Sequence, residues 1–195
     1  MTTPHDPRPL YRRGLTWVTS MLGGVAPKQL DRPTGCADFD VRALDGHLVA
    51  TVERATVIGE GGAPFSVPHI ITGVCDTGWA GAHADATRRM WSVWDDDAKL
   101  AATVQAPWGT ITGAAALWGY LNETLVHGWD LATATGQDSE ADPDVVTPVL
   151  AIAAQIIPAE PRGGPIPFAP VVEAADGAGP TERLANWNGR RRAQS

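Results

Sequence analysis

Three ionisable residues stand on one stretch of an otherwise apolar helical pattern. Glu123 and His127 are four residues apart, so on a helix they share one face about one turn apart, and Asp130 continues the same stripe. A helix that is apolar on nearly every side belongs in the interior of a protein. Removing even one ion from water costs on the order of several kcal/mol. The pattern therefore predicts that a partner neutralises these groups.

A divalent metal would serve as that partner. Glu123 and His127 can hold one ion about 2 Å from a carboxylate oxygen and an imidazole nitrogen. His47 is the candidate third ligand, because it lies midway along an amphipathic helix among apolar residues. Two histidines and one carboxylate leave a coordination position open, as in catalytic sites, and Asp130 then fits as a residue that orients an imidazole. The alternative is an ordinary polar pair four residues apart on a surface, with His47 a hydrogen-bonded core histidine.

The elements that must position these residues are helices. Apolar residues recur at three- and four-residue steps between breaks rich in glycine and proline, and Asp40 stands where an N-cap belongs. Strand signals are weak and confined to Val67–Val74 and Phe168–Val172. We therefore expect an all-α fold, a bundle of four main helices with a long crossover at 59–78 between the second and third. The predicted helices span residues 8–24, 41–57, 80–100, 112–135 and 142–155.

The chain is predicted to divide after residue 157. Residues 1–157 hold the helical bundle. Residues 158–195 are rich in proline and glycine, which favours an arm packed on the bundle. This C-terminal arm ends in Arg190-Arg191-Arg192, a short basic run that we expect to be disordered.

Composition disfavours several classes of partner. The 195 residues carry 15 Lys+Arg against 22 Asp+Glu, a formal net charge of −7, whereas nucleic acid and anionic membranes attract clustered positive charge. No secretory signal pattern and no apolar run of about 18 residues occur, so no membrane span is expected. Two cysteines do not make a disulfide framework and favour a reduced, cytoplasmic setting. The oligomeric state is open between monomer and homodimer.

Three further residues are candidates for the surroundings of the site, namely Cys36, Arg42 and Trp129. Cys36 could act as a nucleophile or a metal ligand, or be a small buried loop residue. Arg42 could clamp a substrate carboxylate, or form a solvent-exposed ion pair. Trp129 adjoins His127 and could shape a pocket wall, or belong to the core. His69 and His83 are expected at the surface, although His83 could approach the site as an acid or base. No catalytic residue is assigned.

Two motifs resemble those of a known family. They are residues 32–44 (RPTGCADFDVRAL), followed by Gly46-His47-Leu48-Val49, and residues 123–137 (ETLVHGWDLATATGQ). Both are similar to signatures of actinobacterial metal-binding proteins related to the N-terminal domain of mycothiol-dependent maleylpyruvate isomerase, in the DinB/YfiT-like superfamily. The likeness covers roughly residues 8–155. Gly35 and Phe39 depart from it, because they stand where the family has proline and tryptophan near the expected rim of the site.

The resemblance implies a DinB-like four-helix bundle with a divalent metal between helices, typically zinc, with nickel, iron, manganese or cobalt as alternatives. The family's ligand set falls on His47, Glu123 and His127. The resemblance also implies that a low-molecular-weight thiol such as mycothiol enters the open position, where a metal-bound thiol ionises more easily. Maleylpyruvate isomerisation itself is not carried over, since only about 40 residues follow the bundle and the larger isomerase's C-terminal domain has no counterpart in them.

The sequence therefore predicts a metal-dependent enzyme. A metal-activated thiol would be transferred to an electrophilic small molecule, or would assist its isomerisation. Two alternatives stay open. One is a non-catalytic metal-binding or sensing module, whose metal would be closed off by a fourth protein ligand such as Asp130 or Cys36. The other is a metal-dependent tailoring enzyme of a biosynthetic pathway that uses no thiol.

Overall fold

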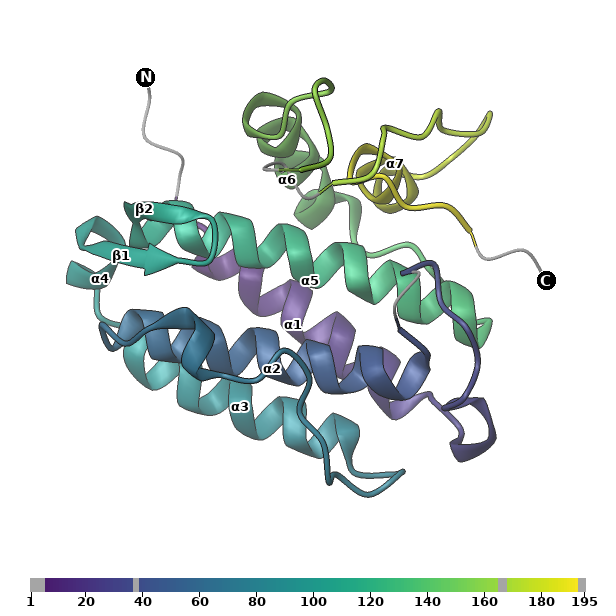
Figure 1. The fold of residues 1–195 in the computed structure, drawn as a ribbon, viewed down its shortest axis with the longest axis horizontal. Coiled ribbons are helices and arrows are strands. Elements are labelled where there is room, and N and C mark those ends of the chain that lie inside the picture. The colour runs from purple at the N-terminus through teal and green to yellow at the C-terminus, as the bar shows by residue number, and fades with distance from the viewer. Residues whose placement is uncertain (1–5, 37–38, 165–167, 193–195) are drawn as a thin grey trace.

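The computed structural model of the protein describes residues 6–36, 39–164 and 168–192. Residues 37–38 of the first motif and 193–195 at the end of the predicted tail lie outside the described residues. The predicted helical class is confirmed (Figure 1). The four longest helices are α1 (Arg8–Gly23), α2 (Val41–Gly59), α3 (Trp79–Trp94) and α5 (Gly113–Thr135).

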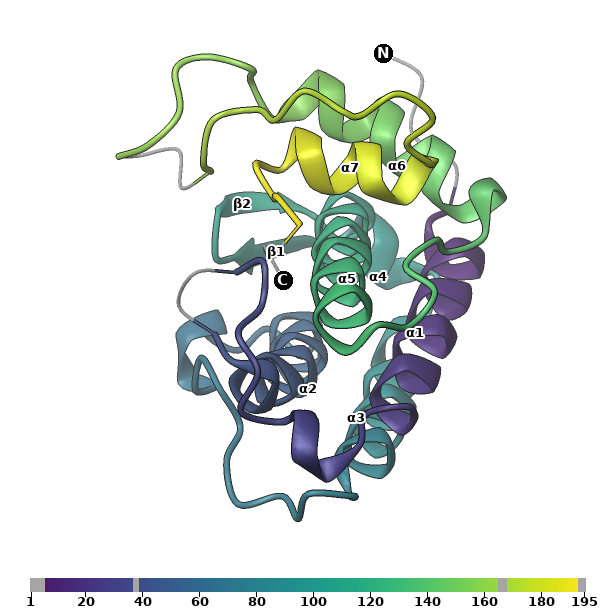
Figure 2. The same ribbon diagram turned by 90° about the vertical axis from the view of Figure 1, so that its right-hand side faces the viewer.

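These four helices pack against one another around one core. Helix α2 contacts α3 and α5, and α1 contacts α3 and α5, so each of the four touches two of the others (Figure 2). The largest fully buried side chains come from all four helices, among them Tyr11, Leu48, Trp94 and Trp129. Helix α5 is buried along most of its length, as its apolar pattern predicts. None of the helices in the described ranges is both long and apolar enough to cross a membrane.

Side-chain caps fix where the two helices of the site begin. The Asp40 carboxylate accepts a hydrogen bond from the Ala43 N–H at 2.8 Å, so the predicted N-cap of α2 is confirmed. The Thr112 hydroxyl accepts from the Ala115 N–H at 3.3 Å and begins α5. Helix α5 ends at Gly136, which adopts a left-handed conformation at φ 74°. These ends set the register of α2 and α5, and with it the positions of the candidate ligands.

Two regions differ from the predicted elements. The third helix ends at Trp94, and a short helix α4 (Ala98–Ala101) leads into an antiparallel hairpin of β1 (Thr103–Ala106) and β2 (Gly109–Thr112). The sequence prediction missed this hairpin, because its four-residue strands are too short to give a clear alternating pattern. The crossover contains one short 3₁₀ helix, η2 (Pro64–Ser66), and no strand forms at 67–74 or 168–172 in the described chain.

The C-terminal arm holds structure that composition did not predict. After α6 (Pro143–Ile156), the chain forms a short helix α7 (Pro180–Trp187), which packs on α5 and α6 (Figures 1 and 2). The Glu140 carboxylate accepts from the first N–H groups of α7, those of Thr181 at 2.9 Å and Glu182 at 3.1 Å. The expectation of a disordered basic tail is wrong for residues 190–192, which make specific contacts with α5 and α7.

Candidate metal centre

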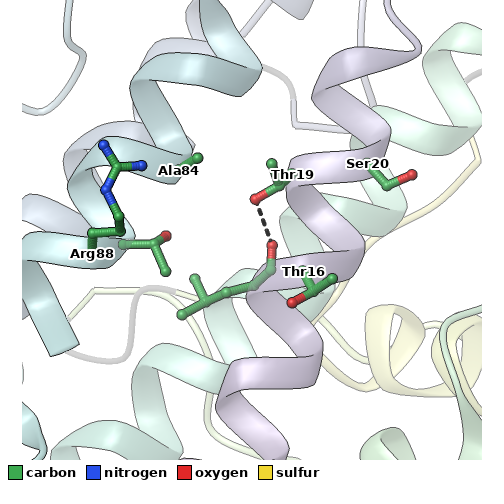
Figure 3. Close-up of a pocket in the computed structure, with 7 residues that line it drawn as sticks. Thr16, Thr19, Ser20, Ala84 and Arg88 are labelled. Carbon is green, nitrogen blue, oxygen red and sulfur yellow. Dashed lines mark hydrogen bonds between the residues drawn. The ribbon is translucent and has the colours of Figure 1, made fainter.

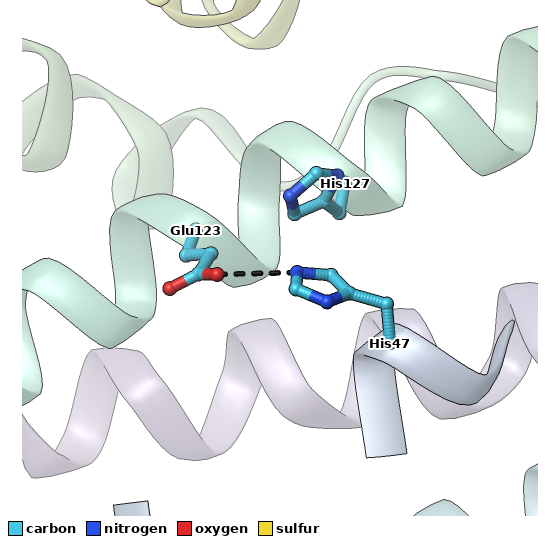
Figure 4. Close-up of side chains that lie close together, drawn as sticks. All are labelled: His47, Glu123 and His127. Atoms are coloured by element: carbon cyan, nitrogen blue, oxygen red, sulfur yellow. Dashed lines mark hydrogen bonds and ion pairs between the residues drawn. The ribbon is translucent and has the colours of Figure 1, made fainter. Parts of the chain in front are cut away.

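Three candidate ligands from two helices come together. His47 projects from α2, and Glu123 and His127 project from α5 toward it (Figure 4). One ligand atom from each lies within 4.8 Å of the other two, and His47 Nε2 lies 3.2 Å from Glu123 Oε1. Among the described residues, this mutually close set contains neither Asp130 nor Cys36. The structure therefore brings the three predicted ligands into one group.

Hydrogen bonds fix which nitrogen of each imidazole faces that group. His47 Nδ1 lies 3.0 Å from the backbone carbonyl of His69, and His127 Nδ1 lies 3.2 Å from Asp130 Oδ2. A carbonyl and a carboxylate only accept hydrogen bonds, so each Nδ1 carries the proton and donates. Each Nε2 then keeps its lone pair. This arrangement, in which the outer nitrogen is held by an acceptor, is typical of metal-ligating histidines.

The close contact between His47 and Glu123 favours a cation between the two side chains. His47 Nε2 and Glu123 Oε1 stand 3.2 Å apart, and with Nδ1 carrying the neutral ring's proton, both atoms are acceptors. Two facing lone pairs repel unless a proton or a cation lies between them. Two imidazole nitrogens and a carboxylate oxygen are ligands that zinc accepts, and tetrahedral ligands about 2.1 Å from the ion lie about 3.4 Å apart. The residues present therefore fit a divalent metal.

Burial shapes the charge state of the group. The side chains of His47 and His127 are 3% and 8% exposed, whereas that of Glu123 is 25% exposed, so the group is reached from the Glu123 side. Burial lowers the pKa of His127, and the hydrogen bond to Asp130 only partly opposes this, which leaves the ring neutral at neutral pH. Burial tends to raise the pKa of Glu123, but a hydrogen bond from the His47 ring in its protonated form and the positive charge of Arg54 lower it overall, so a cation beside the carboxylate stabilises its ionised form. Both groups thus favour the forms that bind metal.

Aromatic rings and the crossover surround the ligands. The Phe39 ring lies 5.1 Å from that of His47 and 6.4 Å from that of His127, measured between centroids. The His69 ring lies 4.6 Å from His47. His69 is exposed, as expected, yet its backbone carbonyl holds His47, a role that no local sequence signal indicates.

Arg54 is a further residue of the surroundings that the sequence analysis did not single out. It lies seven residues after His47 on the same face of α2 and is 6% exposed. Its guanidinium donates to the carbonyls of Pro64 and Pro68 at 3.2 and 3.3 Å. Arg54 and His47 therefore hold the same crossover segment against α2. The signal that could have found Arg54 is a lone charge at helical spacing from a candidate ligand.

The remaining candidate residues lie apart from the three ligands. Arg42 forms an exposed ion pair with Asp76 at 2.6 Å, which agrees with the surface ion pair given as the alternative to a carboxylate clamp. Trp129 is fully buried, with the Arg192 guanidinium 5.7 Å from its ring, so it supports α5 rather than lining an open wall. Cys36 is half-buried in the loop before α2, where its N–H donates to the Thr34 hydroxyl at 3.1 Å.

His83 is wrongly placed by the sequence prediction. It is fully buried on α3, where its Nδ1 lies 2.8 Å from the Thr19 hydroxyl of α1. Burial lowers the pKa of His83 to about 4. A hollow of about 460 Å³ lies beside it between α1 and α3 (Figure 3). That hollow is lined by Leu15, Ala84, Arg88 and four hydroxyl side chains, and no carboxylate or histidine lines it, so it offers no metal-binding set.

Comparison with solved structures defines the class of fold. The chain has the fold of mycothiol-dependent maleylpyruvate isomerase: it matches the crystal structure of that enzyme, and that of a histidine-to-alanine mutant of it, with a TM-score of 0.62 and 17% identity. Each match covers 80% of this chain and 72% of the isomerase chain.

Sequence comparison finds more similar relatives without an assigned activity. The uncharacterized proteins Rv0738 and MT0763, from two strains of Mycobacterium tuberculosis, are each 28% identical to this chain over 186 residues. These matches cover 95% of this chain and 98% of each relative. No family model matches the chain.

Proposed function

We propose that this protein is a divalent-metal-dependent enzyme that uses a low-molecular-weight thiol, such as mycothiol, to modify or isomerise an electrophilic small molecule. The observation that carries the proposal is the convergence of His47, Glu123 and His127, with both outer histidine nitrogens already engaged by acceptors. The fold shared with mycothiol-dependent maleylpyruvate isomerase supports the choice of thiol. Zinc is the proposed metal, with nickel, iron, manganese and cobalt as alternatives.

Different residues of the chain would bind the metal, orient its ligands and cover the site. His47, Glu123 and His127 would hold the metal, whose chemistry is to lower the pKa of a coordinated thiol so that a thiolate is available at neutral pH. Asp130 and the His69 carbonyl orient the two imidazoles. Phe39 covers the histidines on one side and excludes water there. The electrophile would approach from the side where Glu123 is exposed.

An open coordination position separates this proposal from a purely structural metal. Structural zinc sites are usually closed by four protein ligands. Asp130 Oδ2 is committed to His127 Nδ1, and Cys36 is outside the mutually close set, so within the described chain the group supplies three ligands. Three protein ligands favour an enzyme over the non-catalytic metal-binding or sensing module.

The test has two stages. The purified protein is first analysed for metals, and the metal-loaded form is titrated with mycothiol while its melting temperature is followed. We expect one divalent metal per chain and a rise in melting temperature with thiol, followed by turnover of an electrophile from a panel that includes maleylpyruvate. A metal-loaded protein that is indifferent to thiol would favour the tailoring enzyme without a thiol, and one inert across the panel would favour the non-catalytic module.

The proposal also covers the domain organisation, the cellular setting and the oligomeric state. The packing of α1, α2, α3 and α5 supports a DinB-like four-helix bundle as the core, with residues 1–157 as the bundle and 158–195 as the arm. The acidic balance and the small-molecule chemistry support a cytoplasmic protein that engages neither nucleic acid nor membrane. A monomer or a homodimer would serve this chemistry equally well.

A further inference from the structure

We infer that the C-terminal arm is part of the metal centre, because Arg190 positions the ligand His127 through Asp130. This inference rests on the proposed metal site. Arg190 Nε lies 3.1 Å from Asp130 Oδ2, the same oxygen that accepts from His127 Nδ1 at 3.2 Å. The three residues form a chain from the arm to the ligand. Arg190 lies 60 positions after Asp130 in the sequence, so no local sequence pattern predicts their contact.

Burial makes Asp130 dependent on its partners. Its side chain is 0% exposed, and its second oxygen, Oδ1, has no hydrogen-bond partner within the described chain. A buried carboxylate needs compensation from nearby positive or donor groups. His127 supplies a hydrogen bond to Oδ2, and Arg190 supplies positive charge 3.1 Å from the same oxygen, although its Nε–H forms no hydrogen bond within the described chain. Without Arg190, the carboxylate keeps only the imidazole N–H and is free to turn away, and the His127 ring loses its fixed orientation.

The arm is also fixed by contacts that do not involve the Arg190 guanidinium. Asn188 and Asn122 exchange two amide hydrogen bonds, at 3.0 and 3.1 Å, next to Glu123 on α5. Beyond them, the Arg190 N–H donates to the Ala185 carbonyl at 2.9 Å, which turns the chain back toward α5. These contacts fix the arm independently of the guanidinium. A substitution at Arg190 should therefore leave the arm docked, so that its effect reports on the contact with Asp130.

Gly35 offers a second, independent way to disturb the same contact. A Cβ built on Gly35 would lie 2.9 Å from Asp130 Oδ1 and 2.9 Å from the Arg191 carbonyl. Both are closer than side chains normally approach. An alanine at this position therefore has to displace the carboxylate or the arm. This is one of the two positions at which the chain departs from the resembled motif, and the arm approaches the site there.

The experiment compares metal binding by four variants with that of the full-length protein. Removing a residue that orients a ligand typically lowers metal affinity by about 10- to 100-fold. We expect a rise of about tenfold or more in the zinc Kd for Arg190→Ala and for Gly35→Ala. Arg190→Lys should restore much of the affinity, because an ion pair requires the charge rather than the fork of the guanidinium. Arg192→Ala is the matched control, since Arg192 pairs with Glu182 on the surface, and it should change the Kd less than twofold.

A spectroscopic readout separates positioning from folding. The protein is loaded with Co²⁺, whose visible absorption reports the geometry of its ligands. Arg190→Ala should shift this spectrum while the circular dichroism stays that of the wild type. A wild-type protein that binds no metal would overturn the proposed function. A wild type that binds metal, beside an Arg190→Ala variant with unchanged Kd and cobalt spectrum, would overturn only the role of Arg190.

Discussion

Glu123 is the ligand whose replacement separates metal binding from folding most cleanly. Glu123→Gln keeps the size of the side chain and an oxygen that can accept a hydrogen bond, but removes the charge. Zinc bound by four protein ligands in small domains contributes about 10–16 kcal/mol, which is about 2.5–4 kcal/mol per ligand. We take about 3 kcal/mol for the loss of the carboxylate. At about 1.4 kcal/mol per factor of ten, zinc affinity should fall about a hundredfold.

Two assays measure this loss. Competition with a chromogenic zinc chelator gives the Kd directly. Urea unfolding with and without excess zinc gives the stabilisation by the metal, which should shrink by RT ln 100, about 2.7 kcal/mol. The metal-free variant should unfold within about 1 kcal/mol of the metal-free wild type, since the amide has nearly the same size as the carboxylate and can donate a hydrogen bond to His47 Nε2. The proposed role is thus tested on affinity and on stability in the same protein.

Glu53→Gln is the matched control for this experiment. Glu53 lies on α2 in an ion pair with Arg89 at 3.1 Å, and its side chain is 33% exposed, close to the 25% of Glu123. Its replacement removes one comparable charge away from the candidate ligands, so zinc affinity should stay within twofold. A Glu123→Gln variant that binds zinc within threefold of the wild type would refute the reasoning, because the carboxylate would then contribute nothing to the site.

Two further predictions concern the scaffold. His83 is buried with its pKa lowered from 6.5 to about 4, so the folded state binds fewer protons than the unfolded state and loses stability as the pH falls from 6.5 toward 4. Over that pH range, protonation of His83 should lower the free energy of unfolding by about 3 kcal/mol. In urea unfolding at pH 7 and pH 4, the His83→Leu variant should lack this loss. An equal change in unfolding free energy in the wild type and the variant would contradict the prediction. Gly46→Ala should destabilise the protein by about 1–3 kcal/mol and weaken zinc binding, because its Cβ would lie 2.3 Å from the Ile71 carbonyl of the crossover. Gly81→Ala on α3 is the control, because its Cβ would meet no atom within 4 Å, and it should stabilise the protein by about 0.5–1 kcal/mol. If both substitutions changed the melting temperature alike, the prediction would be wrong.

Helical periodicity predicted the parts of the fold and of the candidate site that depend on local spacing. Glu123 and His127 share a face because they are four residues apart on a helix whose burial is evident from its composition. The Asp40 cap and the end at Gly136 are also local signals, and both occur where predicted. The position of His47 midway along an amphipathic helix makes it the candidate third ligand, and the resemblance to a known family gives the same set of three residues.

The missed features all depend on contacts between distant parts of the chain. A run of three arginines is usually solvated, so the sequence predicts a disordered tail there, and only the fold places Arg190 beside Asp130. The sequence also predicts an exposed His83, because a single histidine on a helix gives no indication of its partner Thr19 on another helix. Helix α7 has eight residues in a segment rich in glycine and proline, so helix propensity does not predict it. The Glu140 carboxylate that caps α7 lies 40 residues before it in the sequence.

Metal content is the most direct measure of the central claim, that His47, Glu123 and His127 hold one divalent cation. Elemental analysis is performed on the purified wild type and on His127→Ala, with both shown to be folded by circular dichroism. We predict close to one equivalent of metal per chain in the wild type and close to none in the variant. Equal metal content in the two proteins, or none in a wild type exposed to zinc, would contradict the account.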